Sequence, residues 1–395
     1  MVIQPFNLII KPAGAQCNLA CEYCYFLKKE KLYKGSDFRM SDDVLEKFIT
    51  QYLDSQPDGE VFFTWQGGEP TLMGIAFYMK VLGYQRQYAR PGQKVINAIQ
   101  TNGHLLNDEW CRFLKANDFL VGLSMDGPPE LHDAHRKNKA GQGTHPQALA
   151  GLELLKKHAV DTNILACVSD ANVRQPLEVY RYFRDTLGMQ HLQFIPIVER
   201  ANISGNVPIK PGASQHRENL TTRSVNGKDY GEFLSAIFDE WVRYDVGSVF
   251  VQLFETCVGV WLGYPASICI FSETCGGCLA LEHTGDLYAC DHYVQPDALL
   301  GNVNTSAIGK MAGSEKQREF GLNKKALLPN QCLRCDVRFI CNGGCPKNRI
   351  HAPKSKTLPI NHLCEGYQAF FRHVDQPMKL IAALVKAGRP VQDVM

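Results

Sequence analysis

The sequence predicts an α/β fold, a partial (β/α)6 barrel followed by a cysteine-rich domain. Six apolar runs of strand length recur through the first half of the chain, and amphipathic helical patterns lie between them. Strands that alternate with helices form parallel sheets, and continuously apolar strands indicate that both faces are covered. Ten of the fifteen cysteines then fall between residues 257 and 364, where long periodic segments are scarce.

The six expected strands cover residues 6–10, 61–65, 95–99, 119–123, 163–168 and 192–197. The clearest helix spans residues 41–51, where apolar side chains recur three and four positions apart behind Ser41, a residue suited to capping the first turn. Further helices are expected over residues 77–88, 109–116, 147–158, 177–185 and 230–244.

Four parts of the chain are expected from these patterns. They are a barrel over residues 1–228, linking helices over 229–264, a cysteine-rich domain over 265–366 and a C-terminal helix over 367–395. The first boundary follows from the polar stretch 201–228, which interrupts the alternation of strands and helices. An odd number of cysteines without an export signal indicates metal ligation rather than disulfides, so bound metal is expected to replace part of the core.

Charge and hydropathy narrow the possible partners. The formal net charge of +2 provides no field that would hold nucleic acid or an anionic membrane, so we expect neither as a partner. The first eleven residues contain no charged-then-apolar leader, and the most apolar later stretch, 257–271, is interrupted by glycine, proline and polar residues. These features predict a cytoplasmic protein.

Three cysteines share one short loop directly after the first expected strand. Cys17, Cys21 and Cys24 form a C-x3-C-x2-C run. Three thiolates suit an iron–sulfur cube, and because such a cube has four irons, one iron keeps an open coordination position. Zinc sites normally use C-x2-C or C-x4-C pairs completed to four ligands, so this spacing is not typical of zinc.

Polar or glycine-rich segments follow the next three strands, at residues 66–70, 100–103 and 124–127. Because ligands bind at the carboxyl ends of the strands in parallel β/α folds, we expect these segments to converge with the cysteine loop on one mouth. Gly67 and Gly68 would let backbone carbonyls approach an ammonium group closely, and Glu69 offers a complementary charge.

The cysteine triplet and the turn from Gly67 to Pro70 together resemble the radical S-adenosylmethionine (radical SAM) superfamily. The resemblance implies a TIM-like barrel in which the open iron binds the methionine part of S-adenosylmethionine. It also implies a set of cofactor-binding residues, with the last of them against adenine: Gln66, Gly67, Gly68, Glu69, Gln100, Asn102, Ser124, Arg136 and Ile195.

Two members of this set have a simpler interpretation. Ser124 and the nearby Asp126 lie in a sequence rich in turn-forming residues. Arg136 belongs to a basic stretch and equally fits a solvated surface charge.

The C-terminal cysteines resemble the SPASM extension, which in that family holds two auxiliary 4Fe-4S clusters and brings the total to three. The resemblance assigns the first auxiliary cluster to Cys269, Cys275, Cys290 and Cys345, and the second to Cys332, Cys335, Cys341 and Cys364. Cys278 is an alternative ligand in place of Cys269 or Cys275. Structural zinc is the other interpretation, since C-x2-C is also a zinc spacing.

Segments 63–71, 193–196 and 288–294 are similar to anaerobic sulfatase-maturating enzymes. This resemblance implies oxidation of a Cys or Ser of a sulfatase polypeptide to Cα-formylglycine without oxygen, with a flavodoxin or ferredoxin as electron donor. It places the general base at Asp291. From spacing alone Asp291 is an exposed loop aspartate, but its position beside Cys290 favours the base.

Three other functions stay open. A SPASM enzyme that forms thioether or carbon–carbon crosslinks in a ribosomal peptide would share the eight auxiliary cysteines. A zinc-bound scaffold and a redox carrier without substrate are the others. Near the cluster loop, Tyr25 and Phe26 are expected either to line a peptide channel or to pack as aromatic core. Three remaining cysteines lie in apolar patterns and are expected to be buried, namely Cys111, Cys167 and Cys257.

Overall fold

The computed structural model describes residues 5–201, 220–351 and 358–394. Among these residues, ten strands form one open sheet in the order β10-β9-β8-β1-β2-β3-β4-β5-β6-β7. The six expected strands are present and parallel to their neighbours. They are β1 (Asn7–Lys11), β2 (Gly59–Trp65), β3 (Gln93–Thr101), β4 (Leu120–Ser124), β5 (Thr162–Val168) and β6 (His191–Pro196). The expected partial β/α barrel is therefore confirmed.

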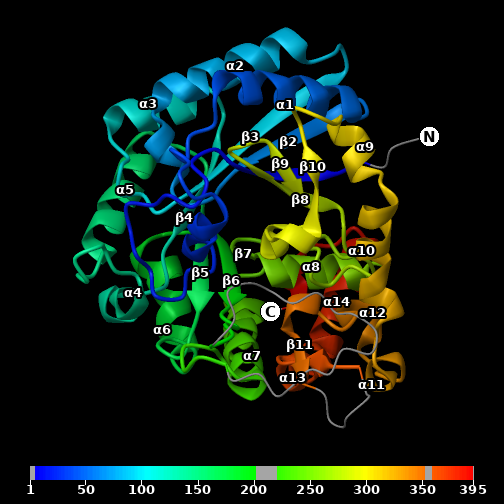
Figure 1. The fold of residues 1–395 in the computed structure, drawn as a ribbon. Helices are drawn as coiled ribbons and strands as arrows, with labels where there is room; N and C mark the ends of the chain where they lie inside the picture. The colour runs from blue at the N-terminus through cyan, green and yellow to red at the C-terminus, as the bar shows by residue number, and fades with distance from the viewer. Residues whose placement is uncertain (1–4, 202–219, 352–357, 395) are drawn as a thin grey trace.

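Helices connect these strands and lie outside them in an arc (Figure 1). They are α1 (Asp42–Ser55), α2 (Ile75–Tyr88), α3 (Asp108–Ala116), α4 (Pro129–His135), α5 (His145–Lys157), α6 (Pro176–Arg181) and α7 (Gly227–Tyr244). The cap expected for α1 is present, because the Ser41 side chain accepts a hydrogen bond from the Val44 N–H. The short helix α4 was not expected. Most of the polar stretch 201–228 lies outside the described residues.

The second half of the chain also contributes strands to the sheet. Strand β8 (Cys278–Glu282) pairs in parallel with β1, so that Lys11 lies opposite Glu282. A hairpin of β9 (Asp286–Tyr288) and β10 (Leu299–Asn302) extends this edge, and β7 (Phe250–Val251) extends the other. The sequence analysis did not predict these strands, because runs of two to five residues carry little periodicity.

Short elements complete the C-terminal part, drawn from yellow-green to red in Figure 1. The helices are α8 (Gln252–Trp261), α9 (Ile308–Ala312), α10 (Glu315–Ala326), α11 (Asn330–Leu333), α12 (Arg338–Cys341), α13 (Cys364–His373) and α14 (Asp375–Lys386), and the strands β11 (Arg349–His351) and β12 (Ile360–Asn361) form a separate pair. The tail contains two helices where one was expected, because Pro377 fits only the first turn of a helix. No helix in the described ranges has the length and apolar character required to cross a membrane. The division of the chain into four parts stays a prediction.

Helices α7 and α13 touch at glycines. A Cβ atom added to Gly366 would lie 1.8 Å from the Gly227 carbonyl oxygen and 2.9 Å from the Gly231 nitrogen. Because both neighbours are backbone atoms, neither can turn aside as a flexible side chain would. The contact connects the barrel to the helix that begins at Cys364.

We expect Gly366→Ala to lower the free energy of unfolding by about 1–3 kcal/mol, because the added methyl group forces α7 and α13 apart. Denaturant unfolding of the anaerobically purified protein measures this change. The control is Gly83→Ala in α2, where an added Cβ meets nothing within 4 Å. It should raise stability by about 0.5–1 kcal/mol through helix propensity. Equal midpoints for the Gly366 variant and the wild type would contradict the account.

Candidate active site at the carboxyl ends of the strands

The glycine-rich turn after β2 lies directly against the loop after β1. The Gln66 N–H donates to the Ile10 carbonyl, and the Gly68 N–H donates to the Gly14 carbonyl, each at 2.8 Å. A Cβ atom on Gly68 would lie 1.7 Å from the Gln16 carbonyl oxygen. This close approach of two backbones requires glycine at position 68.

Glu69 secures the same turn from inside the protein. It is 1% exposed. Its Oε1 accepts hydrogen bonds from the Thr71 N–H, the Thr71 hydroxyl and the Thr101 hydroxyl, and its Oε2 accepts one from the Asn102 N–H at 2.9 Å. Burial raises the pKa of the Glu69 carboxyl, and the hydrogen bonds oppose that shift. The carboxylate therefore fixes the turn to the end of β3, and its contact with an ammonium group stays a prediction.

The three N-terminal cysteines lie together at this mouth. The Cys17 sulfur accepts a hydrogen bond from the Leu19 N–H at 3.3 Å, and the Asn102 amide lies 3.7 Å from it. Burial raises the pKa of the Cys17 thiol to about 12 and that of Cys21 to about 11. What fits iron ligation is the donor set itself, three soft sulfur atoms carried by one loop at the mouth.

Arg136 is buried, so the interpretation as a solvated surface charge is wrong. Its Nε lies 2.9 Å from Asp126 Oδ2, and its Nη2 donates to Oδ1 at 3.0 Å. The Tyr23 hydroxyl and the Cys167 N–H also donate to Asp126. Asp126 is thus a buried partner that orients Arg136. The sequence analysis missed this role, although a carboxylate two residues after a strand was the available signal.

The remaining predicted cofactor residues lie on the inner face of the barrel. The Gln100 amide donates to the Ser124 hydroxyl at 2.9 Å. Ile195 is 40% exposed, unlike the strand residues that pack under the helices. Cys167 lies opposite Ile195 in β5, on the same inner face of the barrel, and is only partly buried. The expectation that Cys167 is buried is therefore wrong. Cys111 is buried as expected, and so is Cys257.

Asp291 is 8% exposed and follows Cys290 directly. The structure therefore contradicts the interpretation as an exposed loop aspartate. Lys11 Nζ lies 2.5 Å from Asp291 Oδ1, and the Tyr25 hydroxyl donates to Oδ2. Burial raises the pKa of Asp291, but the Lys11 charge, the neighbouring His292 and the hydrogen bonds from Lys11 and Tyr25 together outweigh burial and hold that pKa below its usual value. Tyr25 is 40% exposed, whereas Phe26 is buried and packs in the core.

Three of the C-terminal cysteines, Cys269, Cys275 and Cys290, group around a fourth, Cys345. Burial raises the pKa of Cys275 to about 12, and the neighbouring Cys345 and Cys269 contribute to the shift. Burial and Cys345 likewise raise the pKa of Cys290. The buried Lys324 donates to the carbonyl of Cys269 at 2.8 Å and so secures this loop. Whether Cys278, the first residue of β8, serves as a ligand stays a prediction.

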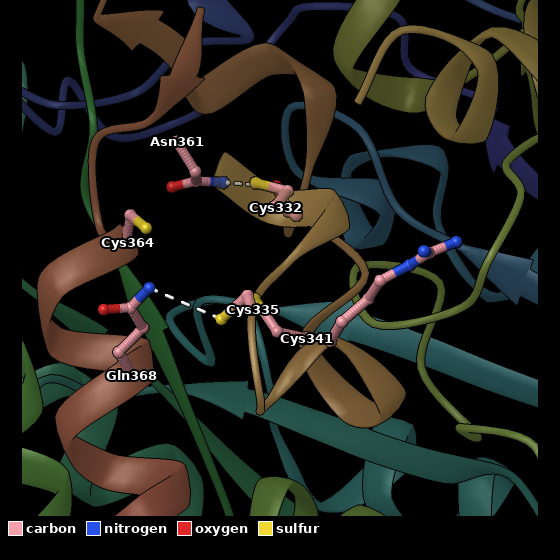
Figure 2. Close-up of a pocket in the computed structure, with 8 residues that line it drawn as sticks. Cys332, Cys335, Cys341, Asn361, Cys364 and Gln368 are labelled. Carbon is pink, nitrogen blue, oxygen red and sulfur yellow. Dashed lines mark hydrogen bonds between the residues drawn. The ribbon is translucent and has the colours of Figure 1, made fainter. Parts of the chain in front are cut away.

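The other four line a single pocket, shown in Figure 2. Cys332 lies in α11 and Cys364 begins α13. Cys335 precedes α12, and Cys341 is the last residue of α12. The Gln368 amide donates to the Cys335 sulfur at 3.4 Å. In residues 5–201, 220–351 and 358–394, no three side chains of His, Cys, Asp or Glu converge as they would around one metal ion such as zinc.

Two segments of the chain match known protein families. Residues 12–183 match the radical SAM superfamily, and residues 269–336 match the SPASM iron–sulfur cluster-binding domain. The first range contains the cysteine triplet and the turn after β2. The second contains Cys269 through Cys335, while three of the predicted auxiliary ligands lie beyond it, namely Cys341, Cys345 and Cys364.

Several relatives match along nearly the whole chain. A serine-type anaerobic sulfatase-maturating enzyme of Bacteroides thetaiotaomicron is 44% identical over 373 residues, which cover 94% of this chain and 90% of the relative. A cysteine-type anaerobic sulfatase-maturating enzyme of Clostridium perfringens is 33% identical and covers 93% of this chain and 96% of the relative.

Solved structures agree with these relatives. The structure of anSMEcpe with bound AdoMet and the Cp18Cys peptide is 32% identical, has a TM-score of 0.84 and covers 97% of this chain and all of that chain. Streptococcus suis SuiB, at 15% identity and a TM-score of 0.61, shares the fold. The identity along the whole chain shows that this protein belongs to the anaerobic sulfatase-maturating enzymes, radical SAM enzymes with a SPASM domain.

Proposed function

We propose that the protein oxidises a serine or cysteine of a sulfatase polypeptide to Cα-formylglycine without oxygen, using S-adenosylmethionine and three 4Fe-4S clusters. The observation that carries this proposal is the burial of Asp291 between Lys11 and Tyr25, one residue after Cys290. It provides a carboxylate at the meeting point of the barrel and the cysteine-rich part. The names of the full-length relatives support the same reaction.

The residues at the mouth suit the proposed cofactors. Cys17, Cys21 and Cys24 would hold the first cluster, and the two C-terminal groups of four cysteines would hold the auxiliary clusters. S-adenosylmethionine would lie against the turn at Gly67 and Gly68 and the cofactor-binding residues predicted above. When bound, these groups supply radical chemistry, in which one hydrogen atom is taken from the target carbon and one electron is taken up.

The chain's own residues provide placement and proton transfer. Asp291 accepts the proton of the target hydroxyl or thiol, because its carboxylate is buried and stays ionised beside Lys11. The Tyr25 side chain orients that carboxylate and lines the space where the target peptide would enter. A target carbon held close to the reacting group reacts within a single complex rather than by a collision. This placement lowers the activation barrier by up to about 7–11 kcal/mol. A flavodoxin or ferredoxin would deliver the electron that starts each cycle.

The proposed reaction predicts a defined mass change in a sulfatase-derived peptide. Anaerobic incubation with reductant and S-adenosylmethionine should remove two hydrogen atoms from a serine peptide. In a cysteine peptide, oxygen should also replace the sulfur. Mass spectrometry of both peptides measures the change, and a peptide with alanine at the target position serves as the control. An internal crosslink, which removes two hydrogens but leaves no aldehyde to react with a hydrazide, would instead establish the peptide-crosslinking alternative.

We expect Asp291→Asn to form 5′-deoxyadenosine while its yield of formylglycine falls by about a hundredfold or more, because the amide cannot accept the target proton. Chromatography of the nucleoside and mass spectrometry of the peptide measure the two products. Asp297→Asn, at an exposed position in the next turn, is the control and should match the wild type. Cys24→Ala should lose both products. Formylglycine at the normal rate in Asp291→Asn would exclude this residue as the base.

Iron content tests the assignment of the second auxiliary cluster. The wild type should hold about 12 iron atoms, and Cys332→Ala or Cys364→Ala should hold about four fewer, because removing one of four thiolates opens the cluster to loss. Cys111→Ala, which removes a buried thiol outside these groups, should keep the full content. Metal analysis together with acid-labile sulfide measures the result. Zinc in place of iron would contradict the assignment.

A further inference from the structure

We propose that Lys11 is a positioning residue for the reaction, one that holds Asp291 and Gln66 in their working orientations. The inference rests on the proposed function and goes beyond it, because Lys11 is outside the cysteine, cofactor and base residues assigned above. Lys11 is the last residue of β1 and is 1% exposed. Its neighbour Ile10 packs in the core under the helices, so Lys11 occupies the opposite, inner face of the strand.

The ammonium group of Lys11 contacts three different parts of the chain. It lies 2.5 Å from Asp291 Oδ1, donates to Gln66 Oε1 at 3.3 Å and lies 4.4 Å from the centre of the Phe26 ring. An ammonium carries three N–H donors, so one group can hold both polar partners at once. Phe26 contributes a cation–π contact that keeps the side chain extended in this direction.

Each contact restricts how its partner can point. Lys11 holds one carboxylate oxygen of Asp291 and Tyr25 holds the other, so the plane of the carboxylate is determined from two sides. In Gln66, the carbonyl oxygen is engaged by Lys11, which leaves the NH2 group to face away as a donor. Lys11 thus orients the acceptor carboxylate of Asp291 and the donor NH2 group of Gln66. Both residues are assigned to the reaction above.

A structural salt bridge is the simpler explanation, and the surroundings of Lys11 argue against it. A buried ion pair adds little stability compared with apolar residues of the same size, because both charges lose their hydration. Lys29 provides a comparison in the same region. It is also buried, but its ammonium donates to the Val294 carbonyl at 2.7 Å. Lys11 differs in that its polar partners are both side chains of the proposed site.

The test compares Lys11→Met, Lys11→Arg and the control Lys29→Met. Methionine keeps the length of the side chain but removes the charge and the donors, whereas arginine restores both. In Lys11→Met we expect formylglycine formed per 5′-deoxyadenosine to fall by about tenfold to a hundredfold, as for a misplaced reacting group. Lys11→Arg should recover most of this ratio, and Lys29→Met should keep it. The paramagnetic resonance spectra of the reduced clusters should be unchanged in all three.

A double-mutant cycle with Asp291→Asn separates positioning from general damage. If Lys11 acts through Asp291, adding Lys11→Met to Asp291→Asn should reduce the product ratio much less than Lys11→Met does in the wild type, and the remaining loss should reflect the contact with Gln66. The loss of thermal midpoint in the double variant should likewise be smaller than the sum of the two single losses. This second readout requires no turnover.

Three outcomes would overturn the inference. They are a wild-type product ratio in Lys11→Met, equal losses in Lys11→Met and Lys29→Met, and additive effects in the cycle. Failure of the wild type to form formylglycine would instead reject the proposed function, while the thermal cycle would still report whether Lys11 and Asp291 are coupled.

Discussion

The parallel pairing of β1 with β8 is the contact on which the arrangement of this protein depends. Five consecutive residue pairs, from Asn7 with Cys278 to Lys11 with Glu282, connect strands that are about 270 positions apart in the sequence. The apolar residues of both strands, such as Leu8 and Leu279, are fully buried on the helix-covered side. Because β8 leads within a few residues to Cys290 and Asp291, this pairing brings the cysteine-rich part to the mouth of the barrel.

Buried charge is the second constraint, and the chain meets it with partners from distant segments. The carboxylate of Asp126 pairs with Arg136 and accepts hydrogen bonds from the Tyr23 hydroxyl and a backbone N–H, so both of its oxygens have partners. The carboxylate of Asp291 likewise pairs with Lys11 and accepts a hydrogen bond from the Tyr25 hydroxyl. An unpaired ion in such surroundings would be strongly destabilising, so each pair restricts the loop that carries it. Both pairs contact the cysteine loop, since Tyr23 and Tyr25 come from that loop.

Partly buried cysteines and a close-packed glycine turn lie together at the mouth of the barrel. Burial raises the pKa of the Cys17 and Cys275 thiols, each to about 12. Backbone hydrogen bonds hold the loop of the first three cysteines against the turn after β2, and Gly68 allows that turn to touch the loop at Gln16. The cysteines predicted to ligate the first cluster therefore lie on a framework of ordinary hydrogen bonds.

The order of strands and helices in the first half, and the residue types at the mouth, could be predicted from the sequence, because periodicity and cysteine spacing are local properties. Tertiary structure alone decided the strands β7 to β10, the burial of Arg136 and the pairing of Lys11 with Asp291. Each of these depends on which distant segment covers a residue, and a short strand or a single charge carries no local trace of its partner. Glu69 shows the same limit, since the sequence identified its carboxylate but only the fold revealed that four hydrogen bonds already occupy it.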